Sequence, residues 1–253
     1  MLELGANIWL THTDPNFTRF KILFLPSFWI TNLKIAIPFI FVSLILIVEY
    51  QFDVIILSFY RSESDVAVYG AASTLVTLLL FGTRSFQLAV FPTISQAFEN
   101  PARLKKIYIK STLAIVSIAL IVITMLSLFS ETAIRLIYGS DYLAASNVFS
   151  ILLWVLLFSA LNVPNSRLMV VANQQRVMAI FAMLSMSTSL ILSFLLVPRY
   201  GGVGSAWARV VAMPFYTVPT IVFTQKKLCP IKWQDVKANI VPDYLFRKIK
   251  NNA

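Results

Sequence analysis

The apolar stretch over residues 33–60 most constrains what this chain can fold into. Residues 35–48 contain nothing more polar than Ser43, and Glu49 and Asp53 follow before the apolar run resumes. A hydrocarbon core about 30 Å thick needs roughly 20 helical residues, and no such window on this stretch avoids Glu49. The i, i+4 spacing places both acids on one helix face, which has to look into protein or a watered cavity because lipid solvates a carboxylate poorly. We therefore predict a membrane span with a polar inner face.

The composition also indicates a membrane protein. Of 253 residues, 58% are hydrophobic and only 13% are charged, whereas soluble domains carry about 25% charged residues. The net charge of +10 in a soluble protein would suggest a nucleic-acid partner. Here the basic residues cluster at the ends of apolar runs, so anionic lipid headgroups explain them better and we expect no nucleic acid.

Single copies of cysteine and histidine limit the possible chemistry. Cys229 is the only cysteine and His12 the only histidine, so an intrachain disulfide is impossible and a Cys/His metal site lacks ligands. The sequence contains no DxD, HxxxxD or HExxH motif of a metal-dependent or histidine-dependent membrane enzyme. We expect no catalytic residues, no metal and no cofactor.

Hydropathy divides the chain into a connector, six spans and a tail. Residues 1–32 are expected to form a cytoplasmic or interfacial connector, residues 33–225 a six-span lobe, and residues 226–253 a basic cytoplasmic tail. Lysine and arginine are enriched in alternate loops, which predicts that both termini are cytoplasmic. The expected spans are approximately residues 33–60, 66–98, 108–129, 143–171, 177–197 and 203–223.

Five segments, in order and spacing, resemble one family of transporters. They are IPFIFVSLILIVEYQFDVIILSFY, VAVYGAASTL, AVFPTISQAF, RLIYGSDYLAASNVFSILLW and VPRYGGVGSAWARVV. Together they resemble the oligosaccharide and polysaccharide flippases of the MOP superfamily, over about residues 33–223. The resemblance implies an all-α polytopic membrane protein with a MATE-like fold, in which two six-helix lobes enclose a cavity. This chain resembles the C-terminal lobe, with residues 1–32 resembling the inter-lobe connector, and a fragment, a truncated product and a half-transporter that pairs all remain open.

The same resemblance implies a substrate and partners. The expected substrate is a lipid-linked oligosaccharide or polysaccharide repeat unit, such as O-antigen for lipopolysaccharide, carried on a polyprenyl pyrophosphate across the cell inner (cytoplasmic) membrane. Expected partners are membrane lipids and either a missing N-terminal lobe or a second copy of the chain. Alternatives are a lipid II flippase or a cation-coupled multidrug exporter. From other classes, a non-transporting scaffold and a membrane-embedded transferase remain.

The candidate site residues lie on the first two expected spans, which by resemblance line the cavity. Arg84 can offer a fixed cation to a pyrophosphate or an acidic sugar, with Gln87 one turn away on the same face. Glu49 or Asp53 can serve as a protonatable coupling site. The alternative is that these charges form structural ion pairs. At 1.5 Å per helical residue, the estimated depth of Arg84 in the membrane is closer to that of Glu49 than to that of Asp53.

Three further features have mainly structural interpretations. Arg209, in the sixth expected span, shares the depth of Asp53 but can reach the membrane surface, so for it we favour a structural role although it stays a cavity candidate. Pro164 within the segment 162–167 predicts a bend or an unwound stretch in the fourth span. We interpret the asparagines of this segment mainly as residues that mark a helix end. The segment GGVGSAW predicts a turn and close helix packing, since no phosphate-loop lysine follows it.

Overall fold

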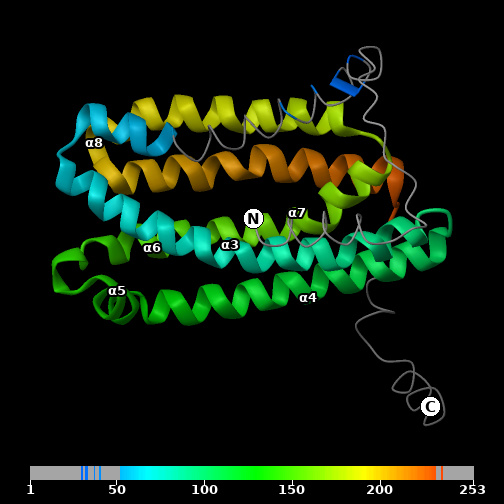
Figure 1. Ribbon diagram of the computed structural model, residues 1–253, viewed down its shortest axis with the longest axis horizontal. Coiled ribbons are helices and arrows are strands. Elements are labelled where there is room, and N and C mark those ends of the chain that lie inside the picture. Colours follow the sequence, from blue (N-terminus) through cyan, green and yellow to red (C-terminus); the bar gives the residue numbers. More distant parts are fainter. Residues whose placement is uncertain are drawn as a thin grey trace, which may run out of the picture. The chain divides into compact units, whose positions relative to one another are not determined.

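The computed structural model describes residues 52–231, together with Ile30, Asn32, Leu33, Ile37, Ile40 and Asp235. Contacts divide the chain into units 1–37 and 38–253, and all the elements below belong to the second. Residues 52–60 are helical, whereas Glu49 and most of the expected connector and tail lie outside the described residues. The elements that follow are α3 (Glu63–Ala97), α4 (Pro101–Leu128), α5 (Ser130–Tyr138), η1 (Ser140–Tyr142), α6 (Ala145–Leu152), α7 (Trp154–Val171), α8 (Gln175–Phe223) and the π-helix η2 (Thr224–Leu228) (Figure 1).

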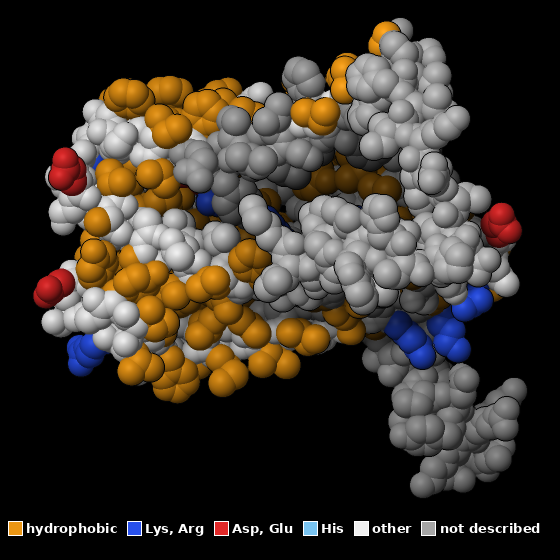
Figure 2. Space-filling view, viewed as in Figure 1, with side chains coloured by type: hydrophobic (Ala, Val, Ile, Leu, Met, Phe, Trp, Pro, Cys, Tyr) orange, Lys and Arg blue, Asp and Glu red, His pale blue; other side chains and the backbone are white. Residues whose placement is uncertain are grey.

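Within residues 52–231, four helical stretches are long and apolar enough to cross a membrane. On the face shown in Figure 2, many of the described side chains between the two ends are hydrophobic, and most charged side chains lie near the ends. This distribution matches a hydrocarbon core between two polar interfaces. The predicted all-α, polytopic membrane fold is confirmed. The four stretches are Glu63–Ala97, Pro101–Leu128, Ala145–Val171 and Gln175–Leu228.

The longest of these stretches, α8, contains a reversal of chain direction. Gly201 has φ 56° and ψ −133°, which are not helical values, and glycine adopts a positive φ without the penalty that a side chain imposes. The break divides α8 into a first arm, residues 175–200, and a second arm, residues 202–223. Figure 1 shows the two arms, yellow and orange, running side by side. The expected fifth and sixth spans fall within these arms, and the six-span count of the whole lobe stays a prediction.

The two arms of α8 approach each other closely at small residues. A Cβ on Gly204 would lie 2.5 Å from the carbonyl oxygen of Leu196, so only glycine fits there. Farther along the arms, Ser185 Oγ donates a hydrogen bond to the carbonyl oxygen of Ala212 at 3.0 Å. The prediction that GGVGSAW forms a turn and a close-packing contact is confirmed.

Apolar contacts hold the bundle together at two levels along α3. The larger cluster surrounds Tyr69 and Phe149, where α3 packs on α6 and the second arm of α8. The smaller cluster surrounds Ile94 and Tyr108, where the end of α3 meets α4 and α7. Residues 83–87 of α3 lie between the α3 residues of these two clusters, and the polar groups described below gather at that level.

The fourth expected span is not unwound where the sequence suggested. α7 continues through Pro164, so of the two predicted alternatives the unwound stretch is wrong, and the bend stays a prediction. The side-chain amides beside the proline donate back to carbonyls one turn earlier, Asn162 to Phe158 and Asn165 to Leu161. These side-chain bonds supplement the backbone pairing around a residue that has no N–H to donate. α6 and α7 form one span over Ala145–Val171, since Leu153 between them keeps helical backbone angles and its N–H donates to the carbonyl oxygen of Phe149 at 2.9 Å.

Candidate functional site

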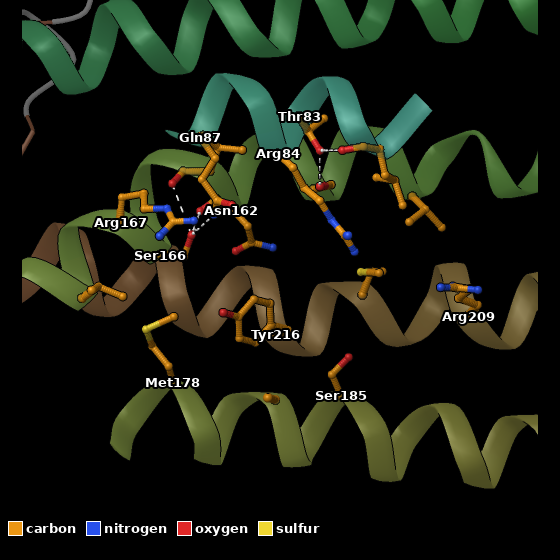
Figure 3. A pocket seen from close by; sticks show the side chains of 17 residues that line it. Thr83, Arg84, Gln87, Asn162, Ser166, Arg167, Met178, Ser185, Arg209 and Tyr216 are labelled. Carbon is orange, nitrogen blue, oxygen red and sulfur yellow. Dashed lines mark hydrogen bonds between the residues drawn. The ribbon is translucent and has the colours of Figure 1, made fainter. Parts of the chain in front are cut away.

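A cavity of about 450 Å³ lies among α3, α7 and both arms of α8. Its apolar lining comes from residues such as Leu80, Val155 and Met213, and many polar groups share its walls. Figure 3 shows the polar side chains reaching into the cavity from three helices. The polar lining residues are Thr83, Arg84, Gln87, Ser159, Asn162, Ser166, Arg167, Ser185, Arg209 and Tyr216.

Three arginines line this cavity, one from each of the helices α3, α7 and α8. Arg84 comes from α3, Arg167 from α7 and Arg209 from the second arm of α8, and Figure 3 shows them spread along the cavity. Arg84 Cζ lies 5.5 Å from the ring centroid of Phe81, and Arg167 Cζ lies 5.4 Å from that of Phe91. No carboxylate of the described residues forms an ion pair with Arg84 or Arg167. The described lining is therefore strongly positive.

The third arginine is held by a buried carboxylate. Arg209 Nη1 lies 3.4 Å from Asp53 Oδ2, and the Tyr69 hydroxyl donates to the same oxygen at 3.0 Å. Both charged side chains are almost fully buried, so the expectation that Arg209 reaches the membrane surface is wrong. The predicted common depth of Arg209 and Asp53 is confirmed by their contact. Asp53 does not line the cavity itself but touches a residue that does.

Neutral hydrogen bonds join α3 to α7 across the cavity wall. Gln87 Nε2 donates to Ser166 Oγ at 3.1 Å, and the hydroxyls of Thr83 and Ser159 lie 3.2 Å apart. Burying such groups costs free energy unless they are paired, so these bonds fix how the two helices face each other. Gln87 thus lines the cavity and also anchors its wall.

Sequence reasoning gave too little weight to the polar residues of α7. Ser159, Asn162 and Ser166 follow one another at intervals of three and four residues, which places them on one helix face. This helical spacing of polar residues inside an apolar run was the sequence signal for a polar face of the span. Tyr69, in contrast, carries no local signal, because its partner Asp53 belongs to a different helix.

The remaining expectations about the site have different outcomes. The expected pairing of Arg84 with Glu49 stays a prediction, since Glu49 lies outside the described residues. The described cavity walls are α3, α7 and α8, so the expectation that the first two spans supply the lining is incomplete. Within the described part of the chain, no group of three or more His, Cys, Asp or Glu side chains is placed to hold a metal ion.

Comparison with known proteins identifies the family. The MatE family model matches residues 38–195, more than half of the chain. This chain belongs to the MatE family. The MatE family lies within the MOP superfamily, and its members are transporters. The resemblance inferred from the sequence is confirmed at this level.

A curated relative of this MatE-family chain comes from Haloferax volcanii. Its name is "probable low-salt glycan biosynthesis flippase", and it is 23% identical over 202 residues. The match covers 77% of this chain and 43% of the relative. The MatE-family chain therefore spans less than half the length of the curated relative it matches.

Proposed function

We propose that this MatE-family chain supplies one lobe of a flippase for lipid-linked oligosaccharide or polysaccharide repeat units. In this proposal the glycan is attached to a polyprenyl pyrophosphate carrier and crosses the cytoplasmic membrane, as in the export of O-antigen units. The observation that carries the proposal is the cavity lined by Arg84, Arg167 and Arg209, with no carboxylate among the lining residues that the structure describes. The relative named as a glycan biosynthesis flippase supports the choice of substrate.

The positive cavity suits a pyrophosphate on physical grounds. A guanidinium group presents several N–H donors in a planar fork that matches phosphate oxygens, and it stays protonated at any physiological pH. A cation at membrane depth is expensive, and such residues generally serve a function. Arg84 is the best candidate because its described contact is an aromatic ring, whereas Asp53 already neutralises much of Arg209. Arg84 thus acts as the main cation for the substrate, and Gln87 and Arg209 complete the wall.

The alternative of a cation-coupled drug exporter fits this cavity less well. A cationic substrate needs a carboxylate to pair with, and the described lining offers three arginines and none. Asp53, the nearest candidate acid, is engaged by Arg209 and Tyr69. A lipid II flippase shares the same polyprenyl pyrophosphate chemistry, so it differs from the leading proposal only in the glycan.

The rest of the proposed architecture completes the transport unit. The lobe comprises six spans over residues 33–225 with both termini in the cytoplasm, and it faces either an N-terminal lobe or a second copy of this chain. Membrane lipids surround it. Arg84 on α3 faces the substrate path, which keeps its guanidinium out of contact with acyl chains.

Binding of a polyprenyl pyrophosphate to the purified chain in lipid nanodiscs tests the proposal. Arg84→Gln removes the cation and keeps a polar side chain of similar length. A hydrogen bond to a charged group contributes about 1.5–3 kcal/mol, so we expect the dissociation constant to rise roughly tenfold to hundredfold. Arg84→Lys keeps the positive charge but loses the planar set of guanidinium N–H donors, so we expect a smaller rise in the dissociation constant.

The matched control is Arg135→Gln, an exposed arginine on α5 that does not line the cavity. We expect it to bind like the wild type. Two results would contradict the proposal: a wild-type chain that does not bind the pyrophosphate lipid, or Arg84→Gln and wild type binding it equally well.

A further inference from the structure

One acceptor atom in the cavity wall has no hydrogen-bond partner in the described part of the chain. Asn162 is 8% exposed and lines the cavity from α7. Its Nδ2 donates to the carbonyl oxygen of Phe158 at 3.1 Å and to Thr217 Oγ1 at 2.6 Å. Its Oδ1 is buried and accepts no hydrogen bond. Both amide hydrogens are therefore used, and the oxygen is left over.

The orientation of this amide is fixed by its neighbours. The Phe158 carbonyl can only accept a hydrogen bond, so the amide nitrogen of Asn162 has to face it. Turning the amide over would set Oδ1 against the Phe158 carbonyl oxygen and lose the bond between Asn162 and that carbonyl. A buried acceptor without a partner costs about 1–3 kcal/mol. A donor that enters the cavity and bonds to Oδ1 would remove this cost and so be bound more tightly.

A second asparagine on the same helix shows the contrast. Asn165 is 1% exposed, does not line the cavity, and is satisfied at both ends. Its Nδ2 donates to the carbonyl oxygen of Leu161 at 2.6 Å, and its Oδ1 accepts from the Tyr108 hydroxyl at 2.7 Å. Asn165 therefore acts in helix packing, while Asn162 keeps an acceptor in a cavity-lining position.

The groups around Asn162 narrow down what the missing donor is. The serines one turn before and one turn after it, Ser159 and Ser166, are already paired with α3. The nearby Arg167 Nε is also buried and has no hydrogen-bond partner. The α7 wall thus offers an unused acceptor and an unused donor, and a hydroxyl group can satisfy either, because it both donates and accepts.

We propose that Asn162 is a specificity-determining residue that accepts a hydrogen bond from the sugar part of the substrate. This inference rests on the proposed function. An ionised pyrophosphate has only acceptor oxygens, and a polyprenyl chain has no polar hydrogen, so neither can donate to Asn162 Oδ1. A glycan hydroxyl or amide N–H can. Arg84 then binds the pyrophosphate, and Asn162 recognises the attached sugar through a hydrogen bond.

Two probes separate these roles in the nanodisc binding assay at pH 8, where both are fully ionised. One is a polyprenyl pyrophosphate whose terminal phosphate carries a methyl ester, and the other is the same lipid with a single N-acetylhexosamine in place of the methyl group, so the two carry equal charge and only the second adds hydroxyl and amide donors. Asn162→Leu removes the acceptor at similar side-chain volume. We expect it to weaken binding of the glycosylated lipid about fivefold to tenfold, the effect of one neutral hydrogen bond. Binding of the sugar-free lipid should not change.

Two control variants isolate the acceptor atom. Asn165→Leu removes another buried asparagine from the same helix and should leave the ratio of the two affinities unchanged. Thr217→Val removes the partner of Nδ2 while keeping Oδ1, so it should also preserve that ratio. Arg84→Gln should weaken both lipids alike.

The outcomes distinguish this inference from the proposed function. If the wild type binds neither lipid, the proposed function fails. If the wild type binds both lipids equally, or if Asn162→Leu weakens both equally, the proposed function stands and the role of Asn162 is refuted. The wild-type comparison remains decisive even if Asn162→Leu does not fold, because a sugar that donates to Oδ1 has to tighten binding.

Discussion

At the scale of single residues, the Asp53–Arg209 pair shows how a buried charge is accommodated. Each ion alone would be costly in the protein interior, and the contact of 3.4 Å with the added Tyr69 hydroxyl offsets that cost. The pair also sets the electrostatics of the cavity. Because Asp53 offsets the charge of Arg209, the remaining two arginines dominate the potential that a substrate meets.

Breaking this pair from one side should destabilise the protein strongly. Asp53→Ala leaves Arg209 buried without its carboxylate, and loss of one partner of such a pair typically costs about 3–5 kcal/mol. The double variant Asp53→Asn with Arg209→Gln leaves no lone charge, so we expect it to recover most of that loss. Unfolding of the purified chain in detergent, followed by circular dichroism, measures the difference.

The control for this prediction is the half-exposed pair Lys105–Asp235. An exposed ion pair contributes about 0–1 kcal/mol, so Lys105→Gln should change the unfolding free energy little. A double variant no more stable than Asp53→Ala would show that the two charged residues do not act as a pair.

At the scale of elements, the reversal in α8 is the feature that shapes the cavity. Both arms of α8 line it, so their spacing sets its width. Arg61, just beyond the helix at 52–60, donates from Nη2 to the carbonyl oxygens of Pro198 and Arg199 at 3.0 and 3.1 Å. These carbonyls lose helical partners at the break, and Arg61 replaces those partners while tying a distant segment to the turn.

A methyl group at the closest approach of the two arms should separate them. Gly204→Ala places Cβ 2.5 Å from the carbonyl oxygen of Leu196, and overpacking of this kind typically costs about 1–3 kcal/mol. We expect a lower unfolding temperature for Gly204→Ala. The neighbouring Gly202→Ala brings Cβ only to 3.5 Å from Tyr69 Cβ, so it should be tolerated. Equal stability of the two variants would contradict the close contact.

At the scale of the whole molecule, the orientation in the membrane can be tested with cysteine labelling. α3 is 35 residues long, or roughly 50 Å at 1.5 Å per residue, so its two ends should lie on opposite sides of the bilayer. On a Cys229→Ser background, Glu63→Cys should react with a membrane-impermeant maleimide in intact cells. Ala102→Cys, similarly exposed in the first turn of α4, should react only after the membrane is opened. The reverse pattern would invert the proposed topology.

The sequence by itself determined the membrane class, the approximate ranges of the apolar helices and the family. These properties depend on local composition and order: a long apolar run favours a membrane span, and a glycine pair shortly after a proline favours a turn. It also identified Arg84, Gln87 and Arg209 as cavity candidates, because a charged or amide group inside an apolar run is visible without any knowledge of packing. All three line the described cavity.

Only the tertiary structure decided which of these groups meet. Asp53 and Arg209 lie 156 positions apart, and no periodicity in the chain shows that their helices are neighbours. The unused acceptor of Asn162 is likewise invisible in the sequence, because it results from Thr217 and Phe158 occupying both hydrogens of one amide. Helix formation depends on local backbone and side-chain preferences, whereas hydrogen-bond partners depend on how the helices pack.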